Sequence, residues 1–152
     1  MTALGMLEVT KLQREHLREV AELERLCFAE PWSAHALELL LGEDAVGAVC
    51  LFEGRVVAYG GMIYSLDEGQ ITNIAVHPDA RRQGCGRAIL HHLLQTAQRR
   101  EIENVFLEVR VSNVGAIALY EEAGFASVGL RKGFYRSPRE DGLVMKKTVN
   151  VL

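Results

Sequence analysis

Apolar and polar positions follow two periods along this chain, and these periods predict its secondary structure. Short apolar runs between turn residues predict strands, whereas apolar residues spaced three and four positions apart predict helices with one buried face. The predicted strands are 7–10, 46–52, 56–65, 70–76, 105–109, 125–130 and 143–148, and the predicted helices are 14–28, 33–41, 84–101 and 113–123. This order predicts an α/β fold in which a mixed central sheet carries helices on both faces.

Two of the predicted helices have a clear apolar face, and two have recognisable ends. The buried faces are expected at Leu17, Val20, Ala21, Leu23, Leu26 and Cys27 in the first helix and at Ile89, Leu90, Leu93, Leu94 and Ala97 in the third. Ser33 and Asn113 stand where a side chain can cap a helix N-terminus, and Gly124 stands where a helix can end. Trp32 is expected to pack on Leu37 of the second helix.

Size and composition predict one soluble globular domain that spans residues 1–152. Hydrophobic residues make up 49% and charged residues 24% of the chain, and no linker or repeat divides it. The net charge of -3 lacks the basic excess that is typical of nucleic-acid-binding proteins. No apolar run reaches the roughly 20 residues of a membrane-spanning helix, and Met1–Glu8 does not resemble a signal peptide. We therefore expect a cytoplasmic monomer or weak dimer with no nucleic-acid or membrane partner.

The cysteines and histidines follow no pattern of a disulfide framework or a metal site. Cys27, Cys50 and Cys85 are odd in number, and no two of them have CxxC spacing. None of the five histidines has ligand spacing with cysteine or acidic residues, and His91 and His92 are expected at the solvent-facing side or edge of their helix. The sequence therefore predicts reduced thiols and no metal cofactor.

A basic loop with two glycines connects a predicted strand to a predicted helix. Its sequence is Arg81-Arg82-Gln83-Gly84-Cys85-Gly86-Arg87. Glycine lets the backbone approach a ligand closely, and the first N–H groups of a helix, together with its dipole, attract an anion. The loop suits a pyrophosphate, and a glycine loop with solvated arginines is the simpler alternative. It lacks the Gly-Lys-Ser/Thr of a Walker loop and the third glycine of a dinucleotide-binding loop.

Several stretches of the sequence resemble the GNAT acetyltransferases. The acetyl-coenzyme-A motif of that family is similar to Asn73-Ile-Ala-Val-His-Pro followed by Arg81-x-x-Gly84-x-Gly86. The bacterial RimI type, which acetylates the N-terminal alanine of a ribosomal protein, is similar to this chain at Pro31-Trp32-Ser33, Leu107-Glu-Val-Arg-Val-Ser-Asn113, Ala116-Ile-Ala-Leu-Tyr-Glu121, Gly124-Phe125 and residues 131–135. The resemblance covers nearly the whole chain. The sequence departs from the type at Cys85, Phe134 and Gly142, where leucine, tyrosine and alanine are usual.

The resemblance implies a GNAT fold and a role for each residue of the expected site. Acetyl-coenzyme A would be the co-substrate, and its pantetheine arm would contact Asn113 and main-chain atoms of Ile74, Ala75 and Val76. The pyrophosphate would be held by Arg81, Arg82, Gln83, Gly84, Cys85, Gly86 and Arg87. Glu108 would accept the proton of the amine, and Tyr120 would donate a proton to the departing thiolate.

Taken without the resemblance, both proton-transfer residues have structural alternatives. Glu108 lies between two apolar residues of its strand, where it could act as a base or form a charge pair with Arg110. Tyr120 lies about two turns into its helix, where a tyrosine is often a core residue with a satisfied hydroxyl.

The resemblance implies a protein N-terminal acetyltransferase. Its acceptor would be the N-terminal alanine of the eighteenth small-subunit ribosomal protein. Two alternatives stay open: an acetyltransferase of a small amine such as a polyamine or aminoglycoside, and a regulatory module that binds coenzyme A without catalysis. The presence of both Glu108 and Tyr120 favours catalysis.

Overall fold

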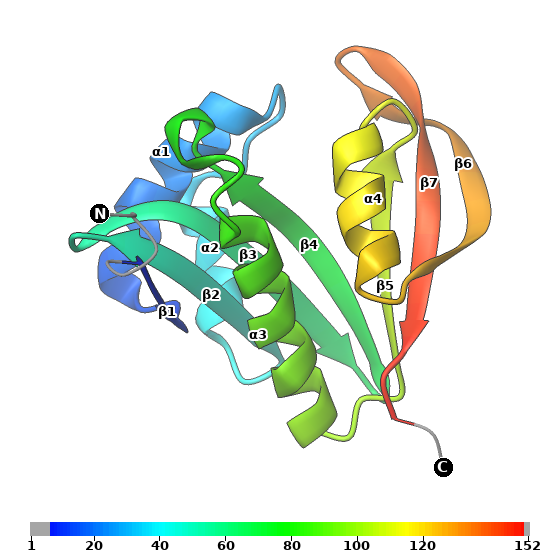
Figure 1. The fold of residues 1–152 in the computed structure, drawn as a ribbon, viewed down its shortest axis with the longest axis horizontal. Helices are drawn as coiled ribbons and strands as arrows, with labels where there is room; N and C mark the ends of the chain where they lie inside the picture. The colour runs from blue at the N-terminus through cyan, green and yellow to red at the C-terminus, as the bar shows by residue number, and fades with distance from the viewer. Residues whose placement is uncertain (1–6, 151–152) are drawn as a thin grey trace.

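The structure is a computed structural model that describes residues 7–150 (Figure 1). Its strands are β1 (Leu7–Lys11), β2 (Ala45–Phe52), β3 (Arg55–Ser65), β4 (Glu68–Val76), β5 (Asn104–Arg110), β6 (Ala126–Arg136) and β7 (Arg139–Thr148). Its α-helices are α1 (Leu17–Cys27), α2 (Ala34–Leu37), α3 (Cys85–Arg99) and α4 (Val114–Glu122), and its 3-10 helices are η2 (Arg14–His16), η3 (Glu38–Leu41) and η4 (Pro78–Ala80). The expectation about a signal peptide concerns mainly residues 1–6, which lie outside the described range.

The strands form one mixed sheet in the order β1-β2-β3-β4-β5-β7-β6. The β4–β5 pair is parallel, and all other neighbouring pairs are antiparallel. Helix α3 packs on β2, β3 and β4, while α1 packs on the other side of the sheet, against β3 and β4 (Figure 1). Both faces of the sheet are therefore covered, which confirms the predicted α/β architecture.

Side chains of β3 point alternately to the two faces of the sheet, so this strand contributes residues to both hydrophobic cores. Ala58 and Met62 belong to the core beneath α3, whereas Tyr59 points to the core beneath α1. Gly60 lets α3 cross the sheet closely, since an added Cβ there would lie only 2.5 Å from Cγ2 of Ile89. This close crossing sets the position of α3, whose N-terminus follows the basic loop.

The centre of the sheet opens between β4 and β5. The two strands pair only from residues 68–70 to residues 104–106, and beyond this point they diverge (Figure 1). The register between β3 and β4 shifts between Gly60 and Met62, whose partners are Ile74 and Ile71, so β4 carries one extra residue there. The bulge and the divergence leave one edge of the end of β4 without a strand partner.

The buried face of α1 differs from the prediction at Leu26, and Cys27 is only partly buried. Leu17, Val20, Ala21 and Leu23 are buried as expected, but Leu26 is 55% exposed and Glu24 is fully buried. Positions 17, 20, 21 and 24 follow the helical spacing of one stripe, and residue 26 lies off that stripe. The prediction that Leu26 is buried was wrong, because it was based on the apolar side chain and not on the position of the residue around the helix.

The remaining elements agree with the prediction in type and differ in length. The second helix is one α-helical turn followed by η3, and Oγ of Ser33 caps it by accepting a hydrogen bond from the N–H group of Ala36 at 3.1 Å. Strands β6 and β7 extend to Arg136 and Arg139, well beyond the apolar segments that predicted them. The extension consists mainly of charged residues and glycines, with Phe134 and Tyr135 among them, so it has no apolar run that would predict a strand.

None of the helices in residues 7–150 combines the length and apolar character needed to cross a membrane. The three cysteines are free thiols, as the sequence predicts. His91 is exposed on α3, and His92 is partly buried.

Candidate active site

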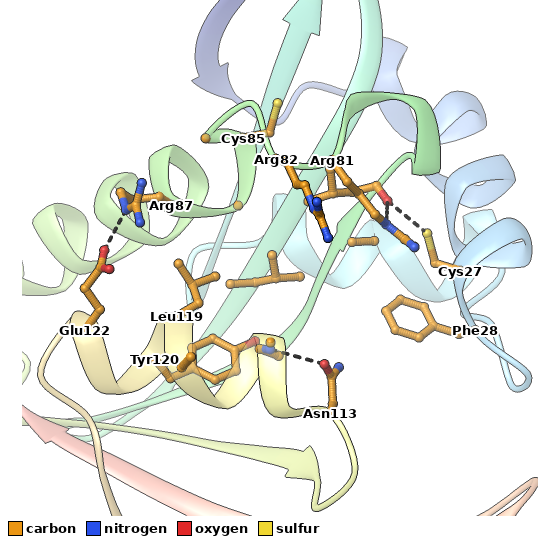
Figure 2. Close-up of a pocket in the computed structure, with 18 residues that line it drawn as sticks. Cys27, Phe28, Arg81, Arg82, Cys85, Arg87, Asn113, Leu119, Tyr120 and Glu122 are labelled. Atoms are coloured by element: carbon orange, nitrogen blue, oxygen red, sulfur yellow. Dashed lines mark hydrogen bonds and ion pairs between the residues drawn. The ribbon is translucent and has the colours of Figure 1, made fainter.

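A cavity of about 780 Å³ lies between the end of β4, the basic loop and α4 (Figure 2). Residues far apart in the sequence therefore meet at one site. The predicted residues that line this cavity are Ile74, Ala75, Val76, Arg81, Arg82, Gly84, Cys85, Gly86, Arg87, Asn113 and Tyr120. Gln83 and Glu108 are the predicted site residues that do not line it.

The end of β4 forms one wall of the cavity with its main chain. Ile74, Ala75 and Val76 pair with β3 on one side, and β5 has already diverged on the other side. The carbonyl of Val76 accepts hydrogen bonds from Nε of Arg81 at 3.2 Å and from the thiol of Cys27 at 3.5 Å. Main-chain groups at this edge are therefore available to a bound chain, apart from the carbonyl of Val76.

The N-terminus of α3 presents free amide groups to the cavity. Gly84 precedes the helix with φ 83°, a left-handed conformation that favours glycine. The first amide bonded within the helix is that of Ala88, which donates to the carbonyl of Gly84 at 3.0 Å. The N–H groups of residues 85–87 precede that bond and have no acceptor in the helix. They can bind an anion such as a phosphate.

The three arginines of the basic loop have different partners. Arg81 is held against the end of β4, and Arg82 has φ 65°, which is uncommon for a residue other than glycine. Nε of Arg87 lies 2.7 Å from Oε1 of Glu122 on α4, and a dashed line marks this pair in Figure 2. Each guanidinium lines the cavity, so the loop supplies positive charge where the α3 amides are free.

The thiol of Cys85 is directed into the protein. Cys85 is 2% exposed and its Sγ donates to the carbonyl of Ala80 at 3.8 Å, and in Figure 2 its side chain points away from Arg87. Burial and the neighbouring Cys85 raise the pKa of Cys50 to about 12. These thiols are structural, and Cys85 contributes only its main chain to the cavity.

Gln83 lies apart from the rest of the loop. It lines a separate cavity of about 390 Å³ on the side of Arg55 and His77. Gln83 is therefore the one residue of 81–87 that does not line the larger cavity, and its role as a pyrophosphate ligand stays a prediction.

Asn113 and Tyr120, at α4, line the wall of the cavity opposite β4. Oδ1 of Asn113 caps α4 by accepting a hydrogen bond from the N–H group of Ala116 at 3.1 Å, as predicted from the sequence. The Tyr120 ring contacts Phe125 edge to face, with centroids 5.9 Å apart. Burial, followed by the nearby Tyr135, raises the pKa of Tyr120 to about 12, so its phenol is neutral at physiological pH.

Glu108 lies on β5, two residues beyond the last residue that pairs with β4. Its Oε1 accepts a hydrogen bond from Nε2 of Gln70 at 3.0 Å, and its Oε2 lies 3.3 Å from Nη1 of Arg131. Its side chain is 20% exposed, so the carboxylate stays accessible to a second substrate. These contacts come from β4 and β6, the neighbours of β5 and β7 in the sheet.

The sequence-based alternative for Glu108 was a charge pair with Arg110. In the structure Arg110 contacts Glu140 at 3.1 Å and the carbonyls of Ser137 and Pro138 at 3.1 and 2.8 Å. It therefore stabilises the β6–β7 turn.

Comparison with known proteins agrees with this geometry. The Acetyltransferase (GNAT) family matches residues 17–125. The [ribosomal protein bS18]-alanine N-acetyltransferase of Escherichia coli strain K12 is 35% identical over 153 residues, which cover 99% of this chain and 100% of that protein. This chain belongs to the GNAT acetyltransferase family. The predicted resemblance, fold and class of enzyme are thereby confirmed.

Solved structures of GNAT acetyltransferases superpose closely on this one. The crystal structure of the Escherichia coli ribosomal-protein-S18-alanine N-acetyltransferase has a TM-score of 0.89 at 34% identity, covering 97% of this chain and 96% of that chain. Arabidopsis thaliana NAA60 in complex with acetyl-CoA has a TM-score of 0.86 at 16% identity, covering 95% of this chain and 99% of that chain. The second likeness shows the fold alone.

The cavity of this GNAT chain fits acetyl-coenzyme A by its own chemistry. Free amides and arginines at the N-terminus of α3 suit a pyrophosphate, and the unpaired edge of β4 suits the amide groups of a pantetheine arm. Among residues 7–150, no three His, Cys, Asp or Glu side chains are grouped so that they could hold a metal ion.

Two elements of the site had no clear signal in the sequence. Cys27 and Phe28 at the end of α1 line the cavity, and Glu24 is buried behind them. Helical phase places Glu24 on the stripe of Leu17, Val20 and Ala21, and this was the available signal. The partners of Glu108 come from distant strands, so local spacing did not identify them.

Proposed function

We propose that this chain transfers the acetyl group of acetyl-coenzyme A to the N-terminal α-amino group of a protein, and that its acceptor is the N-terminal alanine of ribosomal protein bS18. The observation that carries the proposal is the similarity, over 99% of this chain, to the [ribosomal protein bS18]-alanine N-acetyltransferase of Escherichia coli. Arg81, Arg82, Gly84, Cys85, Gly86 and Arg87 would hold the pyrophosphate, and Ile74, Ala75, Val76 and Asn113 would hold the pantetheine arm.

Transfer would proceed directly from the thioester to the amine. Glu108 accepts a proton from the attacking amine, directly or through water, as the nitrogen bonds to the thioester carbon. Main-chain N–H groups near Ala75 and Val76 stabilise the negative charge on the carbonyl oxygen. The carbon–sulfur bond then breaks, and the neutral phenol of Tyr120 donates its proton to the thiolate. The two proton transfers leave coenzyme A as a thiol and the acceptor as an amide.

The proton balance favours an α-amine over a lysine side chain. An α-amino group has a pKa of about 7.7–8.0, against about 10.4 for lysine. Reaching the neutral amine at pH 7 therefore costs about 1 kcal/mol for the first and nearly 5 kcal/mol for the second. A single carboxylate can serve the easier deprotonation.

The acceptor would enter beside Glu108, between the α1–α2 loop and the β6–β7 hairpin. Phe134 and Tyr135 form an edge-to-face pair with centroids 5.0 Å apart. Gly142 makes room for this pair, because an added Cβ would lie 3.2 Å from Cδ2 of Phe134 and 3.3 Å from Cε2 of Tyr135. The two departures from the RimI type, Phe134 and Gly142, are thus packed against each other. We expect the partner to be a ribosomal protein and the enzyme to be cytoplasmic. We expect the enzyme itself to be a monomer or weak dimer.

Two peptides of one sequence test the proposal. One has a free N-terminal alanine, and the other is blocked at its N-terminus and carries an internal lysine. Mass spectrometry after incubation with acetyl-coenzyme A should find acetyl on the free N-terminus, with alanine faster than other first residues. Equal or faster acetylation of the internal lysine would contradict the N-terminal specificity and leave the family assignment intact.

A further inference from the structure

Glu24 is a fully buried carboxylate with no cationic partner among residues 7–150. Its Oε1 accepts a hydrogen bond from the main-chain N–H group of Trp32 at 2.8 Å. Its Oε2 accepts hydrogen bonds from Nδ2 of Asn73 at 2.9 Å and from the hydroxyl of Tyr59. Burying a carboxylate is unfavourable unless donors satisfy it, so these three contacts explain how the group is tolerated.

The donors to Oε2 belong to the part of the sheet whose main chain, at the end of β4, forms one wall of the cavity. Asn73 is in the bulged segment of β4 and directly precedes Ile74, which lines the cavity. Tyr59 is the β3 partner of Ala75, another residue of that wall. Burial and the nearby Glu24 raise the pKa of Tyr59, so its hydroxyl stays a donor. One oxygen of Glu24 thus holds the end of β4 in place.

The donor to Oε1 belongs to a different segment, the loop between α1 and α2. Trp32 lies in the loop between α1 and α2, and the same loop begins at Phe28, which lines the cavity. Trp32 is partly buried against the core beneath α1. The other oxygen of Glu24 therefore holds this loop.

We propose that Glu24 is a positioning residue that fixes the loop of Phe28 and Trp32 relative to the bulged end of β4. The two segments bound the place where acceptor and acetyl group meet, and the carboxylate links them through separate oxygens. This inference rests on the proposed function, because it takes the loop as part of the acceptor site. Glu24 itself does not line the cavity, so it acts through the segments that it holds.

The substitution Glu24→Gln tests the link because glutamine keeps the shape and loses one acceptor. Its single oxygen is expected to stay with the two donors Tyr59 and Asn73. Its NH2 group then faces the N–H group of Trp32, donor against donor, and the loop is released. We expect the KM of an alanine-first peptide to rise about tenfold, as for the loss of one hydrogen bond to a charged group, with the KM of acetyl-coenzyme A unchanged within about twofold.

Trp32 is the only tryptophan of the chain, so its fluorescence reports on the loop without any assay of activity. Acrylamide should quench Trp32 more strongly in Glu24→Gln than in the wild type. Tyr59→Phe removes a donor from Oε2 and leaves the Trp32 contact, and its quenching should match the wild type. Glu38→Gln is the surface control, since Glu38 is 42% exposed and pairs with Arg14.

The outcomes separate this inference from the proposed function. A wild type that does not acetylate the peptide contradicts the proposed function, and the quenching comparison still tests the link. Unchanged quenching in a folded Glu24→Gln, or an equal rise of both KM values, overturns the inference. If Glu24→Gln does not fold, Glu24→Asp serves instead. It keeps both oxygens on a shorter side chain that cannot reach Trp32 and the β4 donors together, so the same increase in quenching is expected and its absence overturns the inference.

Discussion

Nε of Arg87 lies 2.7 Å from Oε1 of Glu122, so an arginine of the basic loop is paired with a carboxylate of α4 at the wall of the cavity. The side chains are 64% and 60% exposed, and a pair this exposed contributes little to stability. Arg87 is therefore free to exchange this carboxylate for a phosphate group of the ligand. Glu122, by contrast, places a negative charge beside the anion site.

Glu122→Gln should therefore strengthen the binding of coenzyme A. The substitution removes the negative charge and frees Arg87, with a gain of about two- to fivefold in affinity, the size of an exposed charge interaction. Titration calorimetry at low salt measures the change, which should shrink as salt is added because exposed charges are screened. Glu121→Gln, one residue away and absent from the cavity lining, is the matched control. Weaker binding in Glu122→Gln would show that the pair positions Arg87 for the ligand.

Valine at either glycine of the loop should abolish coenzyme-A binding while the fold survives. At Gly84, φ 83° disfavours any side chain by about 1–2 kcal/mol. At Gly86, which lines the cavity, an added Cβ would lie 3.5 Å from Leu119 and 3.6 Å from Val76, which are ordinary contact distances. Calorimetry measures affinity and circular dichroism measures folding. Gly129→Ala, where an added Cβ meets nothing within 4 Å, is the control. Unchanged affinity in a folded Gly86→Val would remove the phosphate assignment.

Glu108→Gln should lower turnover and leave coenzyme-A binding unaltered. Loss of a general base typically slows a reaction by about 100- to 10,000-fold. Glu108 does not line the cavity, so the affinity for the cofactor has no reason to change. Steady-state kinetics with an alanine-first peptide at neutral pH gives the comparison. Turnover at the wild-type rate would mean that Glu108 serves only to hold Gln70 and Arg131.

Tyr120→Phe should also slow turnover, by about 100-fold if Tyr120 is the proton donor. Because burial raises the pKa of Tyr120 to about 12, the wild type should show no loss of this donor below about pH 11. A downturn of turnover that begins near pH 8 and disappears in Tyr120→Phe would contradict this assignment.

The same raised pKa predicts how stability depends on alkaline pH. The unfolded tyrosine loses its proton near pH 10, whereas folded Tyr120 keeps it to about pH 12. The folded state therefore binds more protons in this window, and the free energy of unfolding falls as pH rises from about 10 to 12. The contribution of Tyr120 is about 2–3 kcal/mol, taking 1.36 kcal/mol per unit. Urea denaturation at neutral pH and at about pH 11 should show a steeper loss for the wild type than for Tyr120→Phe. Parallel losses would contradict the raised pKa.

Local patterns along the sequence predicted every strand and α-helix of the described residues and most of the residues that line the cavity. Helical and strand periods locate α3 and β4, and the glycines after β4 mark the turn that we propose to bind the pyrophosphate, because these features depend on residues close in sequence. The caps at Ser33 and Asn113 were predicted for the same reason, since a cap needs only the next turn of backbone.

The tertiary structure alone decided which distant groups meet. Glu108 contacts Gln70 and Arg131 because sheet order places β4 and β6 around β5 and β7, and strand order is not contained in any local period. Glu24 is buried because three donors from separate segments converge on it. The sequence by itself determined the strands, the α-helices and the candidate site residues on each of them. Only packing decided their partners, because contacts between elements depend on how the whole chain buries its apolar surface.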